Sequence, residues 1–244
     1  MTGLHMRGDV WMGSARLIRG LVLDMPAAQW SCLLGPSGVG KSTLARLIAG
    51  LPGPFGLDGG LLAGDGLPPA GRVAMMAQTA QLLPWADLLS NVTIGARLRG
   101  RRPDIDRARA LLADVGLAGM ETRHPSELSG GQSQRVALAR TLIEDRPIVV
   151  LDEPFSALDT VARLAMQDLA ARLLKGRTVI LITHDPLEAI RLSDRAWLLG
   201  PGGAEPLTLP PTAPARDWRA QETLAAQAAW LSRLHAVQVR PCGG

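Results

Sequence analysis

Apolar positions along the chain follow two periods, one typical of strands and the other typical of helices. Residues 9–31 contain short apolar runs separated by glycine and polar residues, which predicts antiparallel strands joined by tight turns. The apolar run Trp30–Leu34 predicts another strand, and the helical pattern that follows it ends at Gly50. Residues 51–69 are rich in glycine and proline and predict hairpins and loops.

Helical periodicity dominates the middle of the chain. A short strand is predicted at Arg72–Ala77, and helices are predicted at Leu88–Arg99 and Ile105–Val115. A further helix is predicted after residue 132, because apolar residues recur there at three- and four-residue spacing. We therefore expect a helical insertion at about residues 82–146.

Two apolar runs in the second half, Ile148–Leu151 and Thr178–Ile182, predict strands. An amphipathic helix from Thr160 to about Leu174 separates them. Such continuous apolar character is typical of parallel strands that are buried between helices. The predicted fold class is α/β.

The end of the chain has a different pattern. Proline and glycine dominate residues 201–216 and predict a linker, residues 217–235 predict a helix, and residues 236–244 remain as a tail. Four apolar residues of this segment predict either one docking face or a frayed surface helix: Trp218, Leu224, Trp230 and Leu231.

The composition excludes several classes of protein. With 244 residues, of which 47% are apolar and 20% charged, the chain can bury a core and is neither disordered nor collagenous. A formal net charge of +4 is too small an excess to indicate nucleic-acid binding. Cys32 and Cys242 have no metal-type spacing, which is typical of a reducing compartment. No apolar run reaches the roughly 18 residues that a membrane span needs, so we expect any membrane role to come through a partner.

A glycine-rich segment between the strand at residues 30–34 and the following helix matches the pattern G-x-x-x-x-G-K-[ST] of phosphate-binding loops. Its glycines allow backbone N–H groups to converge on phosphate oxygens, and the start of the helix favours negative charge. Lys41 can reach the β- and γ-phosphates, and Ser42 offers a hydroxyl to Mg²⁺. The strand and helix on either side argue against an incidental glycine-rich turn. The expected nucleotide-binding residues of this loop are Gly35, Pro36, Ser37, Gly38, Val39, Gly40, Lys41, Ser42 and Thr43.

Two carboxylates, Asp152 and Glu153, follow the apolar strand at residues 148–151. The carboxyl end of a parallel strand is where ligands bind in open α/β sheets, so these acids are expected beside the phosphate loop. Asp152 would hold Mg²⁺ and Glu153 would polarise the attacking water. The alternative is that both acids only cap the next segment, which the upstream loop disfavours.

A second anion site is predicted at Leu128–Gln132, which reads Leu-Ser-Gly-Gly-Gln. A serine hydroxyl, bare glycine N–H groups and the start of a helix come together there. With these motifs the chain resembles the ATP-binding subunits of ABC transporters, over about residues 10–199. The resemblance implies a P-loop NTPase core with an antiparallel β subdomain and an inserted α-helical subdomain, within residues 1–200. It also implies ATP and Mg²⁺ as cofactors, and ATP hydrolysis coupled to transport.

The resemblance further implies a head-to-tail homodimer that encloses two ATP molecules. In such a dimer the segment with Ser129, Gly130, Gly131 and Gln132 of one copy closes on the ATP held by the phosphate loop of the other. Asp159 resembles the D-loop aspartate, which couples the two sites.

Gln78 resembles the Q-loop glutamine, which senses Mg²⁺ and the attacking water and links to the membrane partner, and His184 resembles the switch histidine that contacts the γ-phosphate. The implied catalytic residues are Glu153, His184 and Gln78, and the implied metal-binding residues are Ser42, Gln78 and Asp152. Alone, a glutamine or a histidine would be interpreted as a surface or capping residue. Their order along the chain supports the assignment. His5, His124 and His235 have no such support and are interpreted as solvated or locally bonded.

Trp11 is the candidate for stacking on the adenine base. Relatives have an aromatic residue, most often tyrosine, upstream of the phosphate loop, and this chain contains no tyrosine. The alternative for Trp11 is a half-buried tryptophan on a strand.

The segment Gln81–Trp85 resembles importer subunits for nitrate, sulfonates, taurine and pyrimidine vitamin precursors. This implies an importer ATPase on the cytoplasmic face of the inner membrane, with two permease subunits and, indirectly, an extracytoplasmic solute-binding protein, and without nucleic acid. An exposed Leu-Leu-Pro-Trp would offer a groove to a permease helix, although core packing is the alternative. An exporter or lipoprotein-release ATPase is the alternative function. A DNA- or ribosome-directed ABC ATPase and a small-molecule kinase are rivals that leave parts of the sequence unexplained.

Overall fold

A computed structural model describes residues 2–239, which form two units. The first unit contains the chain up to Val73, Pro147–Glu153 and the chain from Leu174 onward. The second contains Ala74–Arg146 and Pro154–Leu173. The chain therefore passes between the units several times, and each unit is assembled from segments that are distant in sequence.

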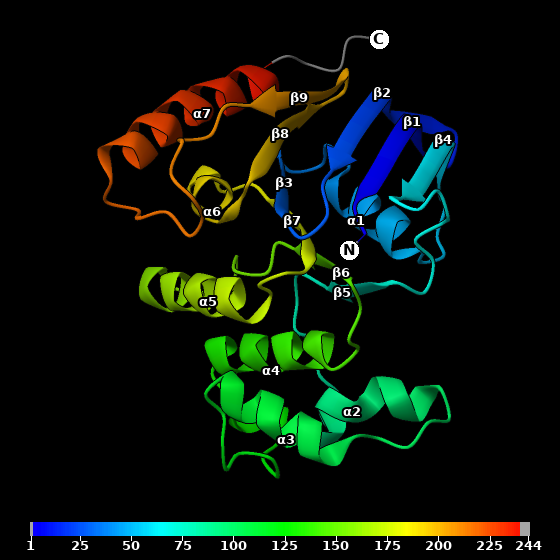
Figure 1. Ribbon diagram of the computed structural model, residues 1–244, viewed down its shortest axis with the longest axis vertical. Coiled ribbons are helices and arrows are strands. Elements are labelled where there is room, and N and C mark those ends of the chain that lie inside the picture. The colour runs from blue at the N-terminus through cyan, green and yellow to red at the C-terminus, as the bar shows by residue number, and fades with distance from the viewer. Residues whose placement is uncertain (1, 240–244) are drawn as a thin grey trace. The chain divides into compact units, whose positions relative to one another are not determined.

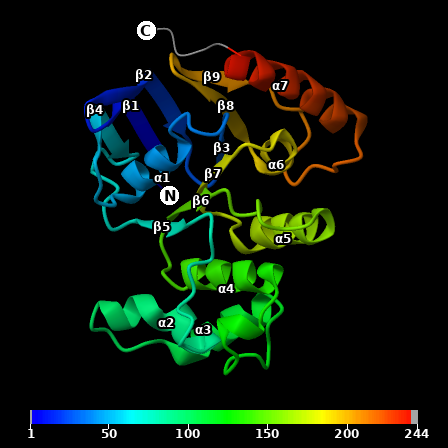
Figure 2. The same cartoon turned by 180° about the vertical axis from the view of Figure 1, so that it is seen from behind.

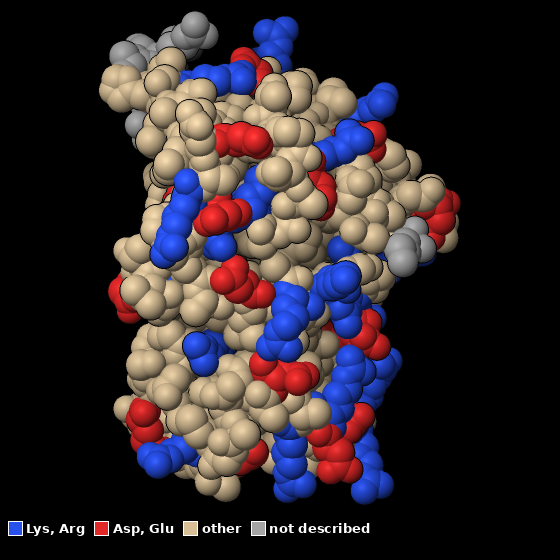
Figure 3. Space-filling view, turned by 60° about the vertical axis from the view of Figure 1, so that its left-hand side comes forward, with Lys and Arg blue, Asp and Glu red and all other residues tan. Residues whose placement is uncertain are grey.

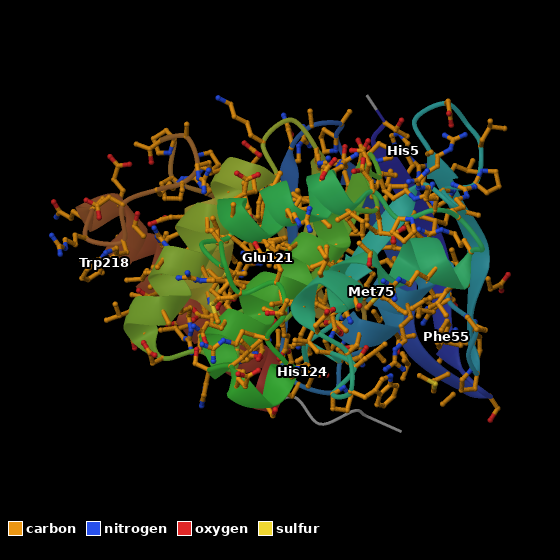
Figure 4. All side chains as sticks on the ribbon, turned by 90° about the horizontal axis from the view of Figure 1, so that it is seen from below. His5, Phe55, Met75, Glu121, His124 and Trp218 are labelled. Carbon is orange, nitrogen blue, oxygen red and sulfur yellow. The ribbon has the colours of Figure 1, made fainter. Side chains whose placement is uncertain are left out.

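A three-stranded antiparallel sheet belongs to the first unit. It consists of β1 (Leu4–Met12), β2 (Ala15–Met25) and β4 (Phe55–Ala63), in the order β2-β1-β4. Alternate residues of β1 and β2 are buried, as the polar and apolar alternation of these strands dictates. His5 on β1 and Phe55 on β4 come from opposite ends of this sheet (Figure 4).

The second sheet of this unit has the order β6-β7-β3-β8-β9. Its strands are β3 (Trp30–Leu34), β6 (Ile148–Asp152), β7 (Thr178–Thr183), β8 (Arg195–Gly200) and β9 (Gly203–Leu207). Neighbouring strands are parallel, except that β9 runs antiparallel to β8. Every residue of β3, β6 and β7 is buried, which explains why these strands are apolar throughout. The strands of this sheet are labelled in Figure 1.

Three helices belong to the first unit: α1 (Lys41–Ala49), α6 (Pro186–Leu192) and α7 (Gln221–Val239). Helix α1 packs against β4, β6 and β7, whereas α6 packs against β3 and β7. Helix α7 contacts α6 (Figure 2). The phosphate-loop helix and the last helix are thus both part of the same folded body.

The second unit is mainly helical. Strand β5 (Val73–Met76) leads into it, and it contains α2 (Leu88–Leu98), α3 (Ile105–Asp114), the short 3-10 helix η1 (Pro125–Glu127), α4 (Gly130–Leu142) and α5 (Thr160–Leu173). Helices α2, α3 and α4 contact one another, and α4 contacts α5. Their buried faces carry residues such as Leu88, Leu112 and Val136, at the positions that the helical periodicity predicts.

The structure confirms the predicted α/β class but changes several boundaries. The expected linker at residues 201–216 contains β9, an edge strand that tolerates Pro206 because it pairs only with β8. The final helix begins at Gln221 rather than at residue 217, since Asp217 accepts the N–H groups of Arg219 and Ala220 in a turn. The same helix includes residues 236–239 of the expected tail.

The expected helical insertion at residues 82–146 lies within the second unit, which begins earlier and also contains residues 154–173. The sequence analysis did not predict α6, β8 and β9 as elements. Of the two cysteines, Cys32 is buried in β3, where burial raises the pKa of its thiol, and Cys242 lies outside the described residues.

Charged side chains of both signs are interspersed on the face drawn in Figure 3. Among the described residues, arginines pair with carboxylates, for example Arg99 with Glu144 at 2.7 Å and Arg107 with Asp145 at 3.1 Å. Within residues 2–239, no helix is both long enough and apolar enough to cross a bilayer.

Candidate active site

Three neighbouring parallel strands of the first unit end in polar segments. The phosphate loop follows β3, Asp152 and Glu153 end or follow β6, and His184 follows β7. The sheet order β6-β7-β3 makes these strands adjacent. Because parallel strands have their carboxyl ends at one edge of the sheet, this topology brings the loop, the acids and the histidine together.

The phosphate loop leads directly into α1 through Gly40, which has a φ of 101°. Only glycine adopts this backbone conformation readily, and a Cβ at this position would lie 3.4 Å from the Leu17 side chain. The Lys41 ammonium is buried and donates hydrogen bonds to the carbonyl oxygens of Gly35 and Pro36, both at 2.9 Å. The Lys41 side chain therefore holds the first residues of the phosphate loop in place.

Burial lowers the pKa of Lys41, and the carboxylates of Glu153 and Asp152 act against this shift. The charged ammonium thus depends on nearby negative charge. A bound triphosphate would add negative charge beside the ammonium, and the charged lysine would in turn favour binding of the anion at this loop.

Ser42 and Asp152 form a pair of oxygen ligands at the start of α1. The Ser42 hydroxyl donates to Asp152 Oδ1 at 3.2 Å. Burial raises the pKa of Asp152, and the nearby Glu153 carboxylate contributes in the same direction. A hydroxyl and a buried carboxylate form the hard oxygen donor set that Mg²⁺ prefers, so these two residues fit that ion.

Glu153 connects Lys41 with His184. Its Oε1 atom lies 3.7 Å from Lys41 Nζ and 3.3 Å from His184 Nδ1, and its side chain is only 13% exposed. Its N–H donates to the carbonyl oxygen of Ile182 at 2.8 Å, which fixes it beside β7. The residue has a φ of 45°, an uncommon value for a residue that is not glycine. Backbone strain of this kind is typical of functional sites.

The segment that carries His184 is held by its neighbours. Thr183 donates its hydroxyl to Glu188 Oε2 at 2.7 Å and accepts the N–H of Asp185 at 3.0 Å. The Asp185 side chain in turn accepts the N–H of Leu187 at the start of α6. These bonds orient the turn after β7 and thereby hold His184 next to Glu153.

The Leu-Ser-Gly-Gly-Gln segment lies in the second unit, at the start of α4. Ser129 accepts the N–H of Gln132 at 3.2 Å, and the Gln132 side chain accepts the N–H of Ser129 at 2.9 Å. This reciprocal capping box leaves Ser129 and Gly130 exposed, with open space where a Gly130 side chain would be. The start of α4 is therefore accessible to an anion.

Asp159 and Gln78 also belong to the second unit. Asp159 accepts the N–H of Ala162 at the start of α5 at 2.9 Å, and the preceding Leu158 lies beside Gly131. Gln78 is exposed, and its carbonyl oxygen accepts from Gln134 at 3.1 Å. The segment that ends at Asp159 and the Leu-Ser-Gly-Gly-Gln segment are thus neighbours within one unit.

The structure places Trp11 away from the cavity at the phosphate loop. Its ring faces the Arg16 guanidinium at 5.8 Å, and it lines a cavity of about 580 Å³ together with Phe55 and other residues of the β4 edge. No phosphate-loop residue lines that cavity. Trp30, in contrast, is buried in β3.

Trp85 is 76% exposed, which rules out core packing for its ring. The buried Asn91 side chain holds the loop before it: it accepts the N–H of Leu83 and donates to the carbonyl oxygens of Leu83, Ala86 and Asp87. One asparagine on α2 therefore presents Trp85 at the surface of the second unit.

Two residues were missed by sequence reasoning. Arg140 on α4 donates to the carbonyl oxygens of Ala80 and Gln81, and so anchors the loop after Gln78. His235, interpreted as solvated or locally bonded, lines a cavity with His184 and the phosphate loop. No motif marks either residue, because only the fold brings each of them to its partners.

The strand, glycine-rich loop and helix, together with the acids after β6, define an ATP-binding protein of the P-loop class. A family described as "ABC transporter" matches residues 18–156, and the chain belongs to this family. It is an ATP-binding subunit whose ATPase activity is coupled to transport, as the sequence analysis predicted.

Several curated relatives are similar over most of the chain. "Aliphatic sulfonates import ATP-binding protein SsuB 2" of Agrobacterium fabrum is 47% identical over 200 residues, which are 79% of this chain and 74% of that protein. "Aliphatic sulfonates import ATP-binding protein SsuB 1" of Rhodococcus jostii is 50% identical over 72% of this chain and 70% of its own length. The SsuB protein of Pseudomonas fluorescens is 45% identical over 88% of this chain and 79% of its own length.

A solved structure supports the fold. The chain is similar to cbiO1 from Clostridium perfringens, described as part of the ABC transporter complex cbiONQ, with a TM-score of 0.72 over 82% of this chain and 86% of that chain. At 24% identity this likeness shows the fold alone, and it confirms the predicted P-loop NTPase architecture.

Proposed function

We propose that the chain is the ATP-hydrolysing subunit of an importer for aliphatic sulfonates. Relatives that are 44–50% identical to it and that carry this name support the substrate class. Their names specify import, which argues against the exporter or lipoprotein-release alternative. Among the solutes expected from the Gln81–Trp85 segment, the relatives favour sulfonates over nitrate and pyrimidine precursors.

The observation that carries the ATPase assignment is the position of Glu153 between Lys41 and His184, at 3.7 Å and 3.3 Å. Glu153 would orient and polarise the attacking water, Lys41 would neutralise charge on the phosphates, and His184 would contact the γ-phosphate. Ser42 and Asp152 would hold Mg²⁺, and the expected third ligand is Gln78. The ion would supply neutralisation of the charge that develops on the phosphate oxygens.

Two copies are proposed to act together, with Ser129, Gly130, Gly131 and Gln132 of one closing on the ATP of the other. The exposed start of α4 supports this role, and Asp159 beside it would couple the two sites. Trp11 remains the proposed adenine platform. Trp11 pairs with Arg16 across β1 and β2, and the neighbouring Leu17 lies beside Gly40 of the phosphate loop, which supports that role.

The chain is proposed to bind two permease subunits at the cytoplasmic face of the inner membrane, as a peripheral protein. Trp85, exposed and held by Asn91, offers the apolar contact that a short permease helix would use. A solute-binding protein outside the cytoplasm would deliver the sulfonate to the permease.

Proteoliposomes that contain the chain, its permease and the loaded binding protein test this function. Phosphate release should rise when the binding protein is saturated with an alkanesulfonate, and not when nitrate or a pyrimidine precursor is offered. Glu153→Gln should lower this release at least about 100-fold, since the water loses its oriented base. Steady turnover in Glu153→Gln would contradict the ATPase assignment, and stimulation by nitrate alone would contradict the substrate class.

A further inference from the structure

A cavity of about 650 Å³ opens beside the phosphate loop, entirely within the first unit. One wall consists of Gly35, Pro36, Ser37 and the switch histidine His184. The opposite wall is the last helix, α7, which contributes Leu231, Ser232, Leu234 and His235. A segment almost 200 residues after the phosphate loop thus faces it across one cavity.

The first wall is bonded directly to the catalytic cluster. Lys41 donates to the carbonyl oxygens of Gly35 and Pro36, and His184 Nδ1 lies 3.3 Å from Glu153 Oε1. The cavity therefore borders the groups that would handle the terminal phosphate of ATP. The side chains of α7 that line the cavity therefore share it with His184 and with the first residues of the phosphate loop.

Helix α7 is a fixed wall rather than a loose tail. Trp230 is only 4% exposed, and Leu234 and Thr223 are buried as well, so one face of the helix packs against the unit. Arg233 pairs with Glu205 on β9 at 2.7 Å. The expected single apolar docking face of Trp218, Leu224, Trp230 and Leu231 is wrong, because Trp230 is buried whereas Leu231 is 50% exposed.

A buried arginine fixes the chain that leads into α7. Arg216 donates to the carbonyl oxygens of Ile190 and Ser193 around the end of α6 and to that of Pro210, at 2.6 to 3.1 Å. Its own carbonyl oxygen accepts from Arg191 at 3.1 Å. The start of α7 is therefore tied to α6, the helix that directly follows His184.

The lining of the cavity suits an anionic ligand. Two imidazoles, those of His184 and His235, and the Ser37 hydroxyl can donate hydrogen bonds into it, whereas the Ser232 hydroxyl donates to the carbonyl oxygen of Ala228. We propose that α7 is a wall of the nucleotide site, and that His235 binds the γ-phosphate end of ATP across this cavity from Ser37 and His184. This inference rests on the proposed ATPase function and adds a residue that the family's motifs do not contain.

The affinities of the full-length chain for ATP and for ADP test the proposal, measured with EDTA present so that ATP is not hydrolysed. His235→Ala should weaken ATP binding about threefold to tenfold, as expected for the loss of one hydrogen bond, and should leave ADP binding unchanged. His235→Asn keeps a side-chain donor and should restore part of the ATP affinity.

His5→Ala is the matched control, because His5 is an exposed histidine of the same unit whose partner is Asp24 at 2.8 Å. It should change neither affinity. Unchanged ATP affinity in His235→Ala, or an equal loss for ATP and ADP, would overturn the proposal, the second result indicating a structural effect of α7. If the wild-type chain bound no ATP at all, the proposed function itself would fail, which is a distinguishable outcome.

Discussion

Asp152 shows how a single residue of the site opposes stability. Its carboxylate is buried, with Glu153 next to it, and both conditions raise its pKa above the ordinary value of 3.8. The folded state therefore holds a proton on Asp152 more tightly than the unfolded state does. Stability contributed by this residue is present in acid and is lost as the pH rises through the raised pKa.

Asp152→Asn removes this dependence while keeping an acceptor for the Ser42 hydroxyl. At pH 7 we expect the variant to be more stable than the wild type by about 1 kcal/mol, and to lose ATP hydrolysis, since a metal ligand is gone. The difference in unfolding free energy should shrink toward zero near pH 4. Urea unfolding of both proteins at the two pH values measures it, and an equal difference at both would contradict the raised pKa.

Residues that belong to a motif could be predicted individually from the sequence, and the structure brings Lys41, Ser42, Asp152, Glu153 and His184 together in one unit. These residues could be predicted because each motif directly follows a predicted strand, and the carboxyl ends of parallel strands meet at one edge of a sheet. Arg140 and His235 could not be predicted, since an isolated arginine or histidine has no pattern and its neighbours come from distant segments. The role of Trp11 stays a prediction for the same reason.

At the level of elements, the start of α4 combines two roles in Ser129. Its side chain caps the helix, and the same hydroxyl and glycine N–H groups are proposed to meet ATP of a second copy. Substitutions can separate these roles, because aspartate caps a helix as well as serine does but carries a negative charge.

Ser129→Ala should lower the unfolding free energy by about 1 kcal/mol, whereas Ser129→Asp should stay within about 0.5 kcal/mol of the wild type. Both should lose ATP hydrolysis, and Ser129→Asp should lose more of it because its charge repels the triphosphate. Thermal or urea unfolding and phosphate release measure the two effects.

Asp104→Ala is the control for capping alone, since Asp104 caps α3 of the same unit by accepting the N–H of Arg107 at 3.0 Å. It should lose similar stability and retain hydrolysis. Wild-type ATP hydrolysis in Ser129→Asp would contradict the proposal that this segment contacts the triphosphate.

Strong periodicity made most elements from Trp30 to Leu173 predictable, because parallel strands and packed helices impose it. Strand β4 is an exception, since it lies in the glycine-rich residues 51–69 that predicted only hairpins and loops. The elements near the end were not predicted for physical reasons. Strand β9 is a short edge strand that contains glycine and proline, and α6 spans only Pro186–Leu192, which is too short to display a helical period. Helix α7 packs with one narrow buried face, so its bounds could not be read from its apolar residues.

At the scale of the whole molecule, the groups that bind phosphate fall into two units. Lys41 and Glu153 belong to the first, whereas Ser129 and Asp159 belong to the second. If each ATP is shared between two copies, every site takes its loop from one copy and its Leu-Ser-Gly-Gly-Gln segment from the other. In a mixed dimer of a loop variant and a segment variant, both defects therefore fall in one site and the other site stays intact.

Mixing two inactive variants should therefore restore activity. Lys41→Ala and Ser129→Asp each inactivate both sites of their own homodimer, but a mixed dimer retains one site with an intact loop and an intact segment. An equal mixture should recover about a quarter of the wild-type rate of phosphate release if subunits exchange at random. Each variant mixed with itself is the control, and a mixture as inactive as its components would contradict the shared sites.

The left-handed backbone of Glu153 has a consequence for how this protein can decay. Glycine adopts that conformation freely, so Glu153→Gly would relieve strain of about 1 kcal/mol while removing the base. A Glu153→Gly substitution would thus yield a subunit that folds well and still binds nucleotide but no longer hydrolyses ATP. In a lineage that had stopped needing its cargo, loss of turnover would come before loss of the folded protein.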